Sequence, residues 1–457
     1  MKIIILGAGQ VGRTAAQHLS REQAHSVTVV DTQQEVLREL QDRLDIRTVV
    51  GNAAHPTVLE AAGGEGADMV VALTNSDEVN MIACQVAHSL FGTPRKIARI
   101  RSSDYSLRHR LFEEGGLHVD VMISPEQLVT EHVGRLIRYP GSLQVLDFAE
   151  GRVRLVGVRA VRGGQLVGHQ LRELPEHLPK RDTRVAAIYR QGRSVQPEGD
   201  TVIEHNDEVF FIAASEDIRS MMKELRTVEE PVRRVVIAGA GNIGLRLAAS
   251  LEDTNQVKLI ERDAGRARRA AEQLGRTLVL TGDAADEDLL IEENIDSVDV
   301  FVSLTNAEEA NILSAMLAKK LGAHRALALI NRPSYAELIE GGSIDVAISP
   351  QTITIGALLA HVRRGDVAKV HSLRRGAAEA IEAVAHGDSR SSPVIGRPLE
   401  RVTLPPGTTI GAIVRGEDVL MAHHDIVIQE DDHVILFLTD RRHVEAVERM
   451  FMPRGSR

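Results

Sequence analysis

Hydrophobic positions alternate between two spacings along the first hundred residues. Short runs rich in β-branched residues, such as 2–6 and 26–30, alternate with segments whose apolar residues recur at helical spacing, such as 11–20 and 77–91. Strands that alternate with helices predict a parallel sheet with helices on both faces. The other elements expected here are strands 47–50, 69–73 and 96–100 and helices 34–42 and 56–62.

The pattern changes after about residue 143. Up to residue 222, apolar and polar positions alternate with a period of two, and turn signals such as Gln191-Gly192 and Glu198-Gly199 interrupt them. This period is typical of strands exposed on one face. The segment therefore predicts a small α+β module that follows the first α/β domain.

The same order of features then recurs in the second half of the chain. Gly7-Ala8-Gly9-Gln10-Val11-Gly12 returns 232 residues later as Gly239-Ala240-Gly241-Asn242-Ile243-Gly244. Further landmarks repeat at similar offsets, namely Asp31 with Glu261, Asn80 with Asn311, Leu73-Thr74-Asn75 with Leu304-Thr305-Asn306, and 202–207 with 427–432. A near-constant offset across so many landmarks indicates duplication of a unit of about half the chain.

These patterns predict an α/β fold with two Rossmann-like, doubly wound parallel-sheet domains, each followed by a small α+β module. The boundaries that we expect are 1–125 and 232–350 for the Rossmann domains, and 140–226 and 368–453 for the modules. The charged segment 223–234, which contains Pro231, separates the two halves.

Each glycine-rich loop lies between an expected strand and an expected helix, the context that makes this motif specific for dinucleotides. Gly7 and Gly239 permit the tight turn, Gly9 and Gly241 let the backbone approach a pyrophosphate, and Gly12 and Gly244 let the helix pack on the strand. Asp31 and Glu261 end the next strand, where a carboxylate accepts hydrogen bonds from ribose hydroxyls and repels a 2′-phosphate. The loops therefore predict NAD rather than NADP.

Other candidate nucleotide contacts lie at the carboxyl ends of later strands, the edge at which open parallel sheets bind ligands. Asn52, Ala53, Asp283 and Ala284 would flank the adenine; Thr74, Asn75, Thr305 and Asn306 would face the ligand; Arg99, Arg101 and Arg332 would reach phosphates. Aligning 101–105 with 331–335 places Asn331 opposite Arg101. By this alignment the second copy lacks an arginine that matches Arg101.

Composition and charge limit the functions to be considered. The chain has 457 residues, a formal net charge of −10, 3% aromatic residues and no Trp, which disfavours a nucleic-acid partner. The single cysteine, Cys84, lies in an apolar helical pattern and is expected to be buried rather than nucleophilic. No segment reaches the roughly 18–20 apolar residues that span a bilayer.

We find no residue set that predicts catalysis or a metal site. The modules offer no acid–base constellation for a hydride-transfer reaction, so we do not expect an enzyme. An NAD-dependent oxidoreductase with a duplicated Rossmann domain stays open as the alternative, and so does an assembly protein with vestigial sites.

The assembled residues resemble the family of regulators of potassium conductance, the RCK or KTN proteins, over nearly the whole chain. The stretches that carry the resemblance are 2–12, 77–85, 97–105 and 123–129. It implies a cytoplasmic regulatory subunit, peripheral at the inner face of the membrane, which gates a membrane potassium-transporter subunit of the Trk type. It also implies NAD(H) and ATP or ADP as ligands, and a homotetramer that forms a ring.

The resemblance further implies a divalent-cation site in some relatives near a glutamate that matches Glu126. The second copy has Gln351 at this position. We therefore predict no metal for this chain.

Overall fold

The computed structural model describes residues 1–21, 25–106, 108–113, 115–178, 182–227, 230–339, 342–362, 367–373, 378–389, 391–422, 425–439 and 441–451. The chain divides into two compact units. One comprises Met1–Leu128 with Pro350–Leu358, and the other comprises Val129–Ser349 with Leu359–Arg457.

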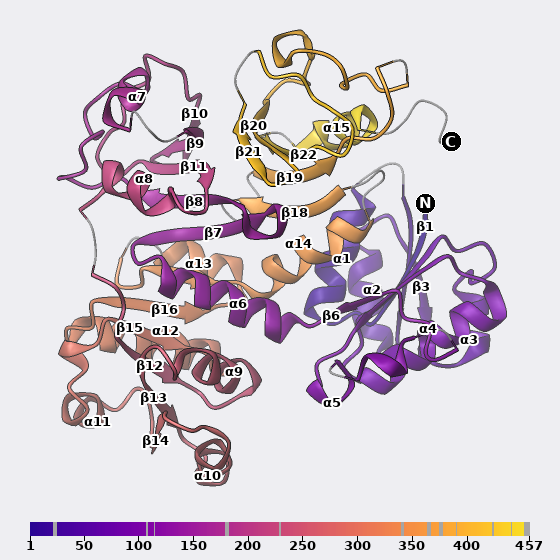
Figure 1. Ribbon diagram of the computed structural model, residues 1–457. Helices are drawn as coiled ribbons and strands as arrows, with labels where there is room; N and C mark the ends of the chain where they lie inside the picture. The colour runs from indigo at the N-terminus through magenta and orange to yellow at the C-terminus, as the bar shows by residue number, and fades with distance from the viewer. Residues whose placement is uncertain are drawn as a thin grey trace. The chain divides into compact units, whose positions relative to one another are not determined.

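The first unit contains a six-stranded parallel sheet with strand order β3-β2-β1-β4-β5-β6 (Figure 1). Its strands are β1 (Lys2–Leu6), β2 (Ser26–Asp31), β3 (Arg47–Val50), β4 (Met69–Ala72), β5 (Arg95–Arg99) and β6 (Val121–Ile123). The helices are α1 (Gln10–Ser20), α2 (Gln34–Gln41), α3 (Pro56–Ala61), α4 (Asp77–Phe91) and α5 (Ser103–Ser106), with the 3₁₀ turn η1 (His109–Leu111). Helix α6 (Pro125–Arg138) follows β6, and from Val129 on it belongs to the second unit. The strand order reverses between the parallel strands β1 and β4, which opens the crevice in which doubly wound sheets bind ligands.

The second parallel sheet has the equivalent order β14-β13-β12-β15-β16-β17. Its strands are β12 (Arg234–Ala238), β13 (Gln256–Glu261), β14 (Leu278–Thr281), β15 (Val300–Ser303), β16 (Arg325–Leu329) and β17 (Val346–Ile348). The helical segments are α9 (Asn242–Leu251), α10 (Ala264–Gln273), α11 (Glu287–Glu292), η4 (Ile295–Ser297), α12 (Glu308–Lys320), α13 (Pro333–Ile339) and α14 (Pro350–Val362). The prediction of a duplicated doubly wound sheet is confirmed.

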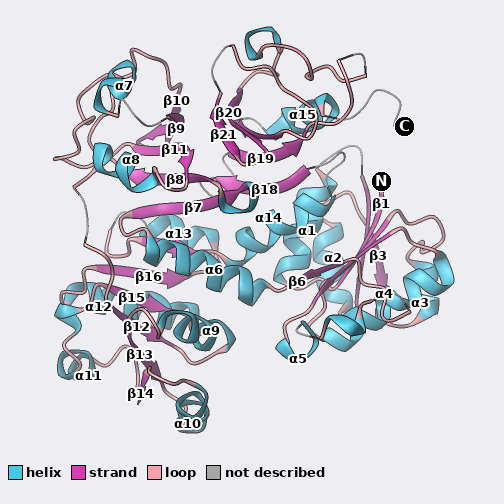
Figure 2. Ribbon diagram, in the orientation of Figure 1, coloured by secondary structure: helices cyan, strands magenta, loops and turns pink. Residues whose placement is uncertain are grey.

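Each parallel sheet is followed along the chain by a five-stranded antiparallel sheet with few helices (Figure 2). Module 1 contains β7 (Ser142–Phe148), β8 (Val153–Arg159), β9 (Thr183–Arg190), β10 (Arg193–Val195) and β11 (Glu208–Ala214), with η2 (Ala149–Gly151), η3 (Leu171–Glu173), α7 (Leu174–His177) and α8 (Ile218–Leu225). Module 2 contains β18 (Val367–Leu373), β19 (Ala378–Val384), β20 (Thr408–Arg415), β21 (Asp418–Met421) and β22 (His433–Leu438), with η6 (Leu399–Arg401), η7 (Arg441–His443) and α15 (Val444–Met450). The strand orders, β10-β9-β11-β8-β7 and β21-β20-β22-β19-β18, are the same.

The two modules share a hydrophobic core inside the second unit. Leu146, Phe148 and Phe210 of module 1 pack in one buried cluster with Ile435 and Phe437 of module 2. Both antiparallel sheets thereby cover an apolar face that alternating strand sequences otherwise leave exposed. The duplicated halves are thus joined through their modules.

Candidate nucleotide sites at the carboxyl edges of the parallel sheets

The backbone of the first glycine loop requires glycine at two positions. Gly7 has φ +100°, and a Cβ placed there would lie 2.9 Å from the carbonyl oxygen of Leu73. A Cβ on Gly12 would lie 1.9 Å from the carbonyl oxygen of Gly7. The second loop repeats this geometry, with φ +103° at Gly239 and 1.9 Å between a Cβ on Gly244 and the oxygen of Gly239. These four glycines let β1 and β12 turn directly into α1 and α9.

The middle glycine of each loop has a different role. No heavy atom lies within 4 Å of a Cβ built on Gly9 or Gly241, and both residues have extended backbone angles. Each is the N-cap of its helix, no side chain caps the first turn, and that turn contains no acidic residue. The first amides of α1 and α9 therefore face open space that a Cβ would occupy, which fits a pyrophosphate bound at a helix N-terminus.

The carboxylate of Asp31 is held against the first loop. Its Oδ2 accepts from the amide of Ala8 at 2.6 Å, and its Oδ1 accepts from the amide of Gln33 at 2.8 Å. A carboxylate has about four acceptor positions. Asp31 therefore keeps one acceptor on each oxygen, the arrangement that two neighbouring ribose hydroxyls need.

Glu261 occupies the same place in the second copy, but its acceptors are more fully used. Oε2 accepts from the amide of Ala240 at 2.9 Å, while Oε1 accepts from the amide of Asp263 at 2.9 Å and from Nη2 of Arg266 at 3.0 Å. Burial by itself would raise the pKa of Glu261, but the two amides and Arg266 outweigh it and lower the pKa. Arg266 is the arginine that the structure pairs with this carboxylate.

Thr74 and Thr305 end the fourth strand of their sheets and are held by buried asparagines. The Nδ2 of Asn80 donates to the carbonyl oxygen of Arg99 at 2.9 Å, and its Oδ1 accepts from the amide and hydroxyl of Thr74. Asn311 makes the equivalent bonds to Thr305 and to the carbonyl oxygen of Leu329. Each asparagine thus fixes the ends of two neighbouring strands. Sequence reasoning noted Asn80 and Asn311 as repeat landmarks but assigned them no role at the site.

The remaining strand-end residues are less exposed to a ligand than the sequence predicts. Asn52 and Asp283 accept from the amides of Ala54 and Ala285 in matching turns, at 2.9 Å each. The side chain of Ala53 is buried in the core of the first unit, and Ala284 packs against the core of the second sheet. That these two alanines flank an adenine stays a prediction. Asn306 is exposed, and the carbonyl oxygen of Asn75 accepts from Arg101.

Arg101 and Arg332 occupy equivalent places, which corrects the alignment made from sequence. The amide of Arg101 donates to Asp77 at 2.9 Å, and the amide of Arg332 donates to Glu308 at 2.8 Å. Asp77 and Glu308 are the first residues of α4 and α12, and each also forms a 3.5 Å ion pair with the same arginine. The second copy therefore does have a counterpart of Arg101, one residue later than the motif comparison places it. The acidic residue that begins the next helix, Asp77 or Glu308, could have identified the matching arginine, because each binds it.

Arg99 distinguishes the first copy from the second. Its Nη2 pairs with Oε1 of Glu126 at 3.3 Å, and its Nε is buried with no hydrogen-bond partner in the described part of the chain. An unpartnered buried N–H is costly, so this donor fits a ligand phosphate at the carboxyl edge. Leu329 and Gln351 stand at the corresponding positions of the second copy. Glu126, the position at which the resemblance implies a cation in some relatives, has an arginine beside it here.

Two further findings concern alternative chemistry. Burial raises the pKa of the Cys84 thiol to about 12, so this side chain is not poised as a nucleophile. Within the described ranges, no three His, Cys, Asp or Glu side chains are placed to hold a metal ion.

Across the part of the chain that the structure describes, no helix combines the length and the apolar character needed to cross a membrane.

The fold and the paired loops define a class of protein: two tandem domains, each a Rossmann-type α/β sheet followed by an antiparallel module. The chain is similar in fold to the crystal structure of the GsuK RCK domain, with a TM-score of 0.61 and 18% identity over 98% of this chain and 94% of that one. A structure titled GsuK channel bound to NAD gives a TM-score of 0.61 and 19% identity over 98% and 78%.

Sequence comparison narrows the class to one family. The TrkA-N domain model matches residues 3–125 and 235–350, and the TrkA-C domain model matches 152–226 and 389–452. The Trk system potassium uptake protein TrkA of Halomonas elongata is 59% identical over 99% of this chain and 98% of its own length. The TrkA of Vibrio alginolyticus is 58% identical over 99% of both chains. The chain belongs to the TrkA family.

Proposed function

We propose that this chain is the nucleotide-sensing regulatory subunit of a Trk-type potassium uptake system and that it acts by binding rather than by catalysis. The observation that carries the proposal is the pair of open cradles at Gly9 and Gly241, each next to an acid held on its loop. Relatives named as Trk potassium uptake proteins supply the transport context. A membrane transporter is then the partner, and the working location is the cytoplasmic face of the membrane.

The ligand that we assign to the first site is NAD(H). The two free acceptors of Asp31 suit an unmodified ribose, and a 2′-phosphate beside this carboxylate would meet like charge. Support from neighbours comes from the structure titled GsuK channel bound to NAD. ATP or ADP would offer the same adenosine and phosphate groups to the loop.

We propose that Glu261 binds the ribose at the second site more weakly than Asp31 does at the first. Arg266 takes one of the acceptors that Glu261 would otherwise offer to the ribose. This arginine also brings a positive charge to the place at which a 2′-phosphate would lie. The second site therefore discriminates less between NAD and NADP than the first.

Regulation follows if the nucleotide binds two conformations of the assembly with different affinity, because a ligand shifts an equilibrium only by that difference. The ring-shaped homotetramer implied by the resemblance stays part of this proposal. The oxidoreductase alternative requires an acid or base beside the nicotinamide, and no residue set in the described chain argues for one.

The test is potassium uptake in cells that carry the matching transporter subunit. Gly9→Asp places a carboxylate in the phosphate cradle of a protein that still folds, because aspartate is a favoured N-cap residue. We expect the variant to stay associated with transporter-containing membranes but to lose nucleotide-dependent control of uptake. Wild-type protein that fails to associate with such membranes would refute the role as a subunit.

A further inference from the structure

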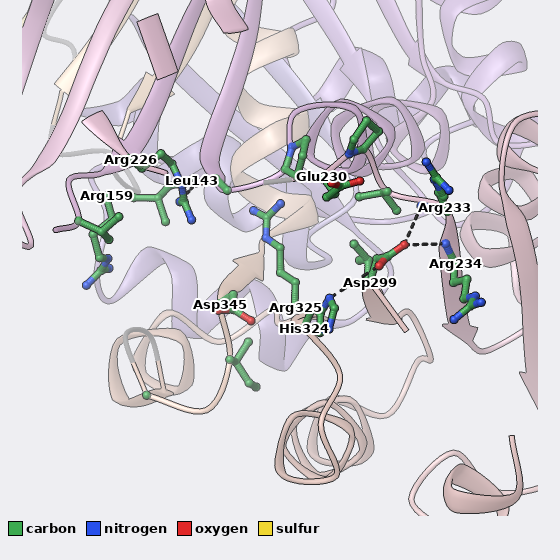
Figure 3. A pocket seen from close by; sticks show the side chains of 18 of the residues that line it. Leu143, Arg159, Arg226, Glu230, Arg233, Arg234, Asp299, His324, Arg325 and Asp345 are labelled. Atoms are coloured by element: carbon green, nitrogen blue, oxygen red, sulfur yellow. Dashed lines mark hydrogen bonds and ion pairs between the residues drawn. The ribbon is translucent and has the colours of Figure 1, made fainter. Parts of the chain in front are cut away.

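A second cavity in the second unit lies at the edge of the parallel sheet opposite to the glycine loop. It has a volume of about 1040 Å³, which matches or slightly exceeds typical small-molecule sites. The amino-terminal ends of β12, β15 and β16 form one wall, and residues of module 1 such as Arg159 and Asn206 form the other (Figure 3). Segment 230–234, which leads from module 1 to β12, closes the cavity between them.

The lining is rich in arginine although the chain as a whole carries a net charge of −10. Five arginines and three carboxylates line the cavity among the described residues, the arginines being Arg159, Arg226, Arg233, Arg234 and Arg325. No Phe, Tyr or Trp is among these lining residues, and the one imidazole, of His324, lies 3.7 Å from Asp299, so a base would find little stacking surface. The cavity is therefore suited to phosphate groups rather than to a nucleobase.

Two of the three carboxylates are already used by the protein. Asp299 accepts from the backbone amides of Arg233 and Arg234 at 2.7 and 2.9 Å, as Figure 3 shows. Asp345 accepts from Nζ of Lys319 and from the amide of Ala326, both at 2.8 Å. These bonds hold the wall in place and occupy acceptor positions of both carboxylates, which leaves Glu230 as the third carboxylate of the lining.

The guanidinium groups of Arg233 and Arg234 are exposed and form no ion pair within the residues that the structure describes. The side chain of Arg234 donates only to the carbonyl oxygen of Ser297, at 3.4 Å. Arg325 is buried and donates to the carbonyl oxygens of Leu136 and Ser142. Guanidinium groups bind phosphate oxygens in pairs, and this binding strengthens where water is partly excluded.

We propose that this cavity is a second effector site, which binds a small phosphorylated anion with two or three phosphate groups. It is separate from the nucleotide cradle, because β12 begins at Arg234 in the cavity and ends one residue before Gly239. A five-residue strand spans about 16 Å, so both sites can be filled together. The anion would contact both module 1 and the second parallel sheet. It would therefore favour the conformation in which the two lie close enough to bind it together.

The experiment is a calorimetric titration of the full chain with inorganic tripolyphosphate, in a Gly9→Asp/Gly241→Asp background that blocks both glycine loops. We expect saturable binding of one anion per chain. Adding Arg233→Gln and Arg234→Gln should weaken it at least about tenfold, a loss of about 1.4 kcal/mol. The charge-matched control is Arg219→Gln/Lys223→Gln on the exposed face of α8, which should bind as before.

Three results would overturn the proposal: no saturable binding in the blocked background, equal weakening in the control, or unchanged affinity in Arg233→Gln/Arg234→Gln. ATP titrated in the same way distinguishes a nucleotide from a free polyphosphate as the source of the phosphates. NADH titrated into Arg233→Gln/Arg234→Gln with intact loops should bind as it does to wild type. That arm separates failure of this site from failure of the nucleotide sites.

Discussion

Gly9 and Gly12 lie three residues apart in one turn, and they are glycine for opposite reasons. A Cβ on Gly12 meets backbone at 1.9 Å, whereas a Cβ on Gly9 meets nothing. Gly12 therefore serves the fold, and Gly9 leaves room for a ligand. The same contrast holds for Gly244 and Gly241.

This contrast predicts separate effects on stability and binding. Gly12→Ala should lower the free energy of unfolding by about 3 kcal/mol or more, because the backbone has to move. Gly9→Ala should leave stability unchanged or raise it by up to about 1 kcal/mol, while NADH affinity falls. Thermal melts and NADH titration of both variants provide the measurement. Equal destabilisation by the two variants would contradict the assignment.

The role of Arg266 at the second site can be tested in a Gly9→Asp background, in which the first site is blocked. Arg266→Gln removes the ion pair with Glu261 and frees one acceptor for the ribose. One additional hydrogen bond is worth about 1 kcal/mol, so NADH should bind about fivefold more tightly and NADPH more weakly. Arg268→Gln, an exposed change on the same helix, serves as the control. A parallel loss of both ligands would show that Arg266 contacts their shared part.

Sequence alone predicted the roles of the loop glycines because each role follows from backbone geometry. It misplaced the arginine that matches Arg101, since a motif comparison cannot show which residue donates to the first acid of the next helix. Sequence comparison also missed Arg266, because the corresponding residue of the first copy is a valine, Val36, and no repeated motif marks the position. Side-chain pairing across a turn depends on three-dimensional placement.

At the scale of elements, the two modules repeat one buried ion pair. Arg190 binds Asp207 through two hydrogen bonds of 3.0 and 2.9 Å, and Arg415 binds Asp432 through two of 2.8 Å. Both aspartates are fully buried and also accept from a backbone amide, of Glu204 and of Gln429 respectively. Each pair fastens the end of one central strand to the loop before another.

Asp432→Ala should therefore destabilise the protein by about 3–5 kcal/mol, since it leaves the guanidinium of Arg415 without its partner. Asp207→Ala should destabilise module 1 less, but still by more than about 1 kcal/mol, because Arg190 keeps its ion pair with Glu204. Chemical denaturation would report the loss, with Glu272→Ala as a surface ion-pair control expected to cost less than about 1 kcal/mol. A loss below 1 kcal/mol for either aspartate would contradict a structural role for the pair.

A buried histidine on α6 gives a pH prediction. Burial, with the charges of Arg135 and His371 nearby, lowers the pKa of His132 to about 3. The neutral ring is favoured in the fold, so its contribution to stability is complete above the unfolded pKa of about 6.5. It declines as pH falls from there towards 3, by at most about 5 kcal/mol. Denaturation of wild type and His132→Leu at several pH values should show a shallower dependence in the variant; identical slopes would contradict this.

The boundaries of the elements expected up to residue 100 were predicted to within one residue, as with Lys2–Leu6, Arg47–Val50 and Asp77–Phe91, whereas α5, β6 and α6 were not predicted. Periodicity sufficed there because the parallel strands are buried and their helices amphipathic. The core shared by the two modules was not foreseen. Alternating strands show that one face is apolar, but they do not show which surface covers it.

At the scale of the whole molecule, duplication provides two candidate nucleotide sites with unequal surroundings. The first has Asp31 with two free acceptors and Arg99 with a buried donor. The second has the Glu261–Arg266 pair, and Leu329 in place of Arg99. The cavity lined by Arg233 and Arg234 was invisible to sequence reasoning, because its walls come from segments far apart along the chain. We therefore expect a chain that integrates more than one ligand.

The most direct test of the central claim is a calorimetric titration of NADH into wild type, Gly9→Asp and Gly241→Asp. We expect NADH to bind the wild type saturably and without turnover. The tighter of the two NADH-binding events should be lost in Gly9→Asp and retained in Gly241→Asp. NADH affinity that is the same in all three proteins, or no saturable binding by the wild type, would contradict it.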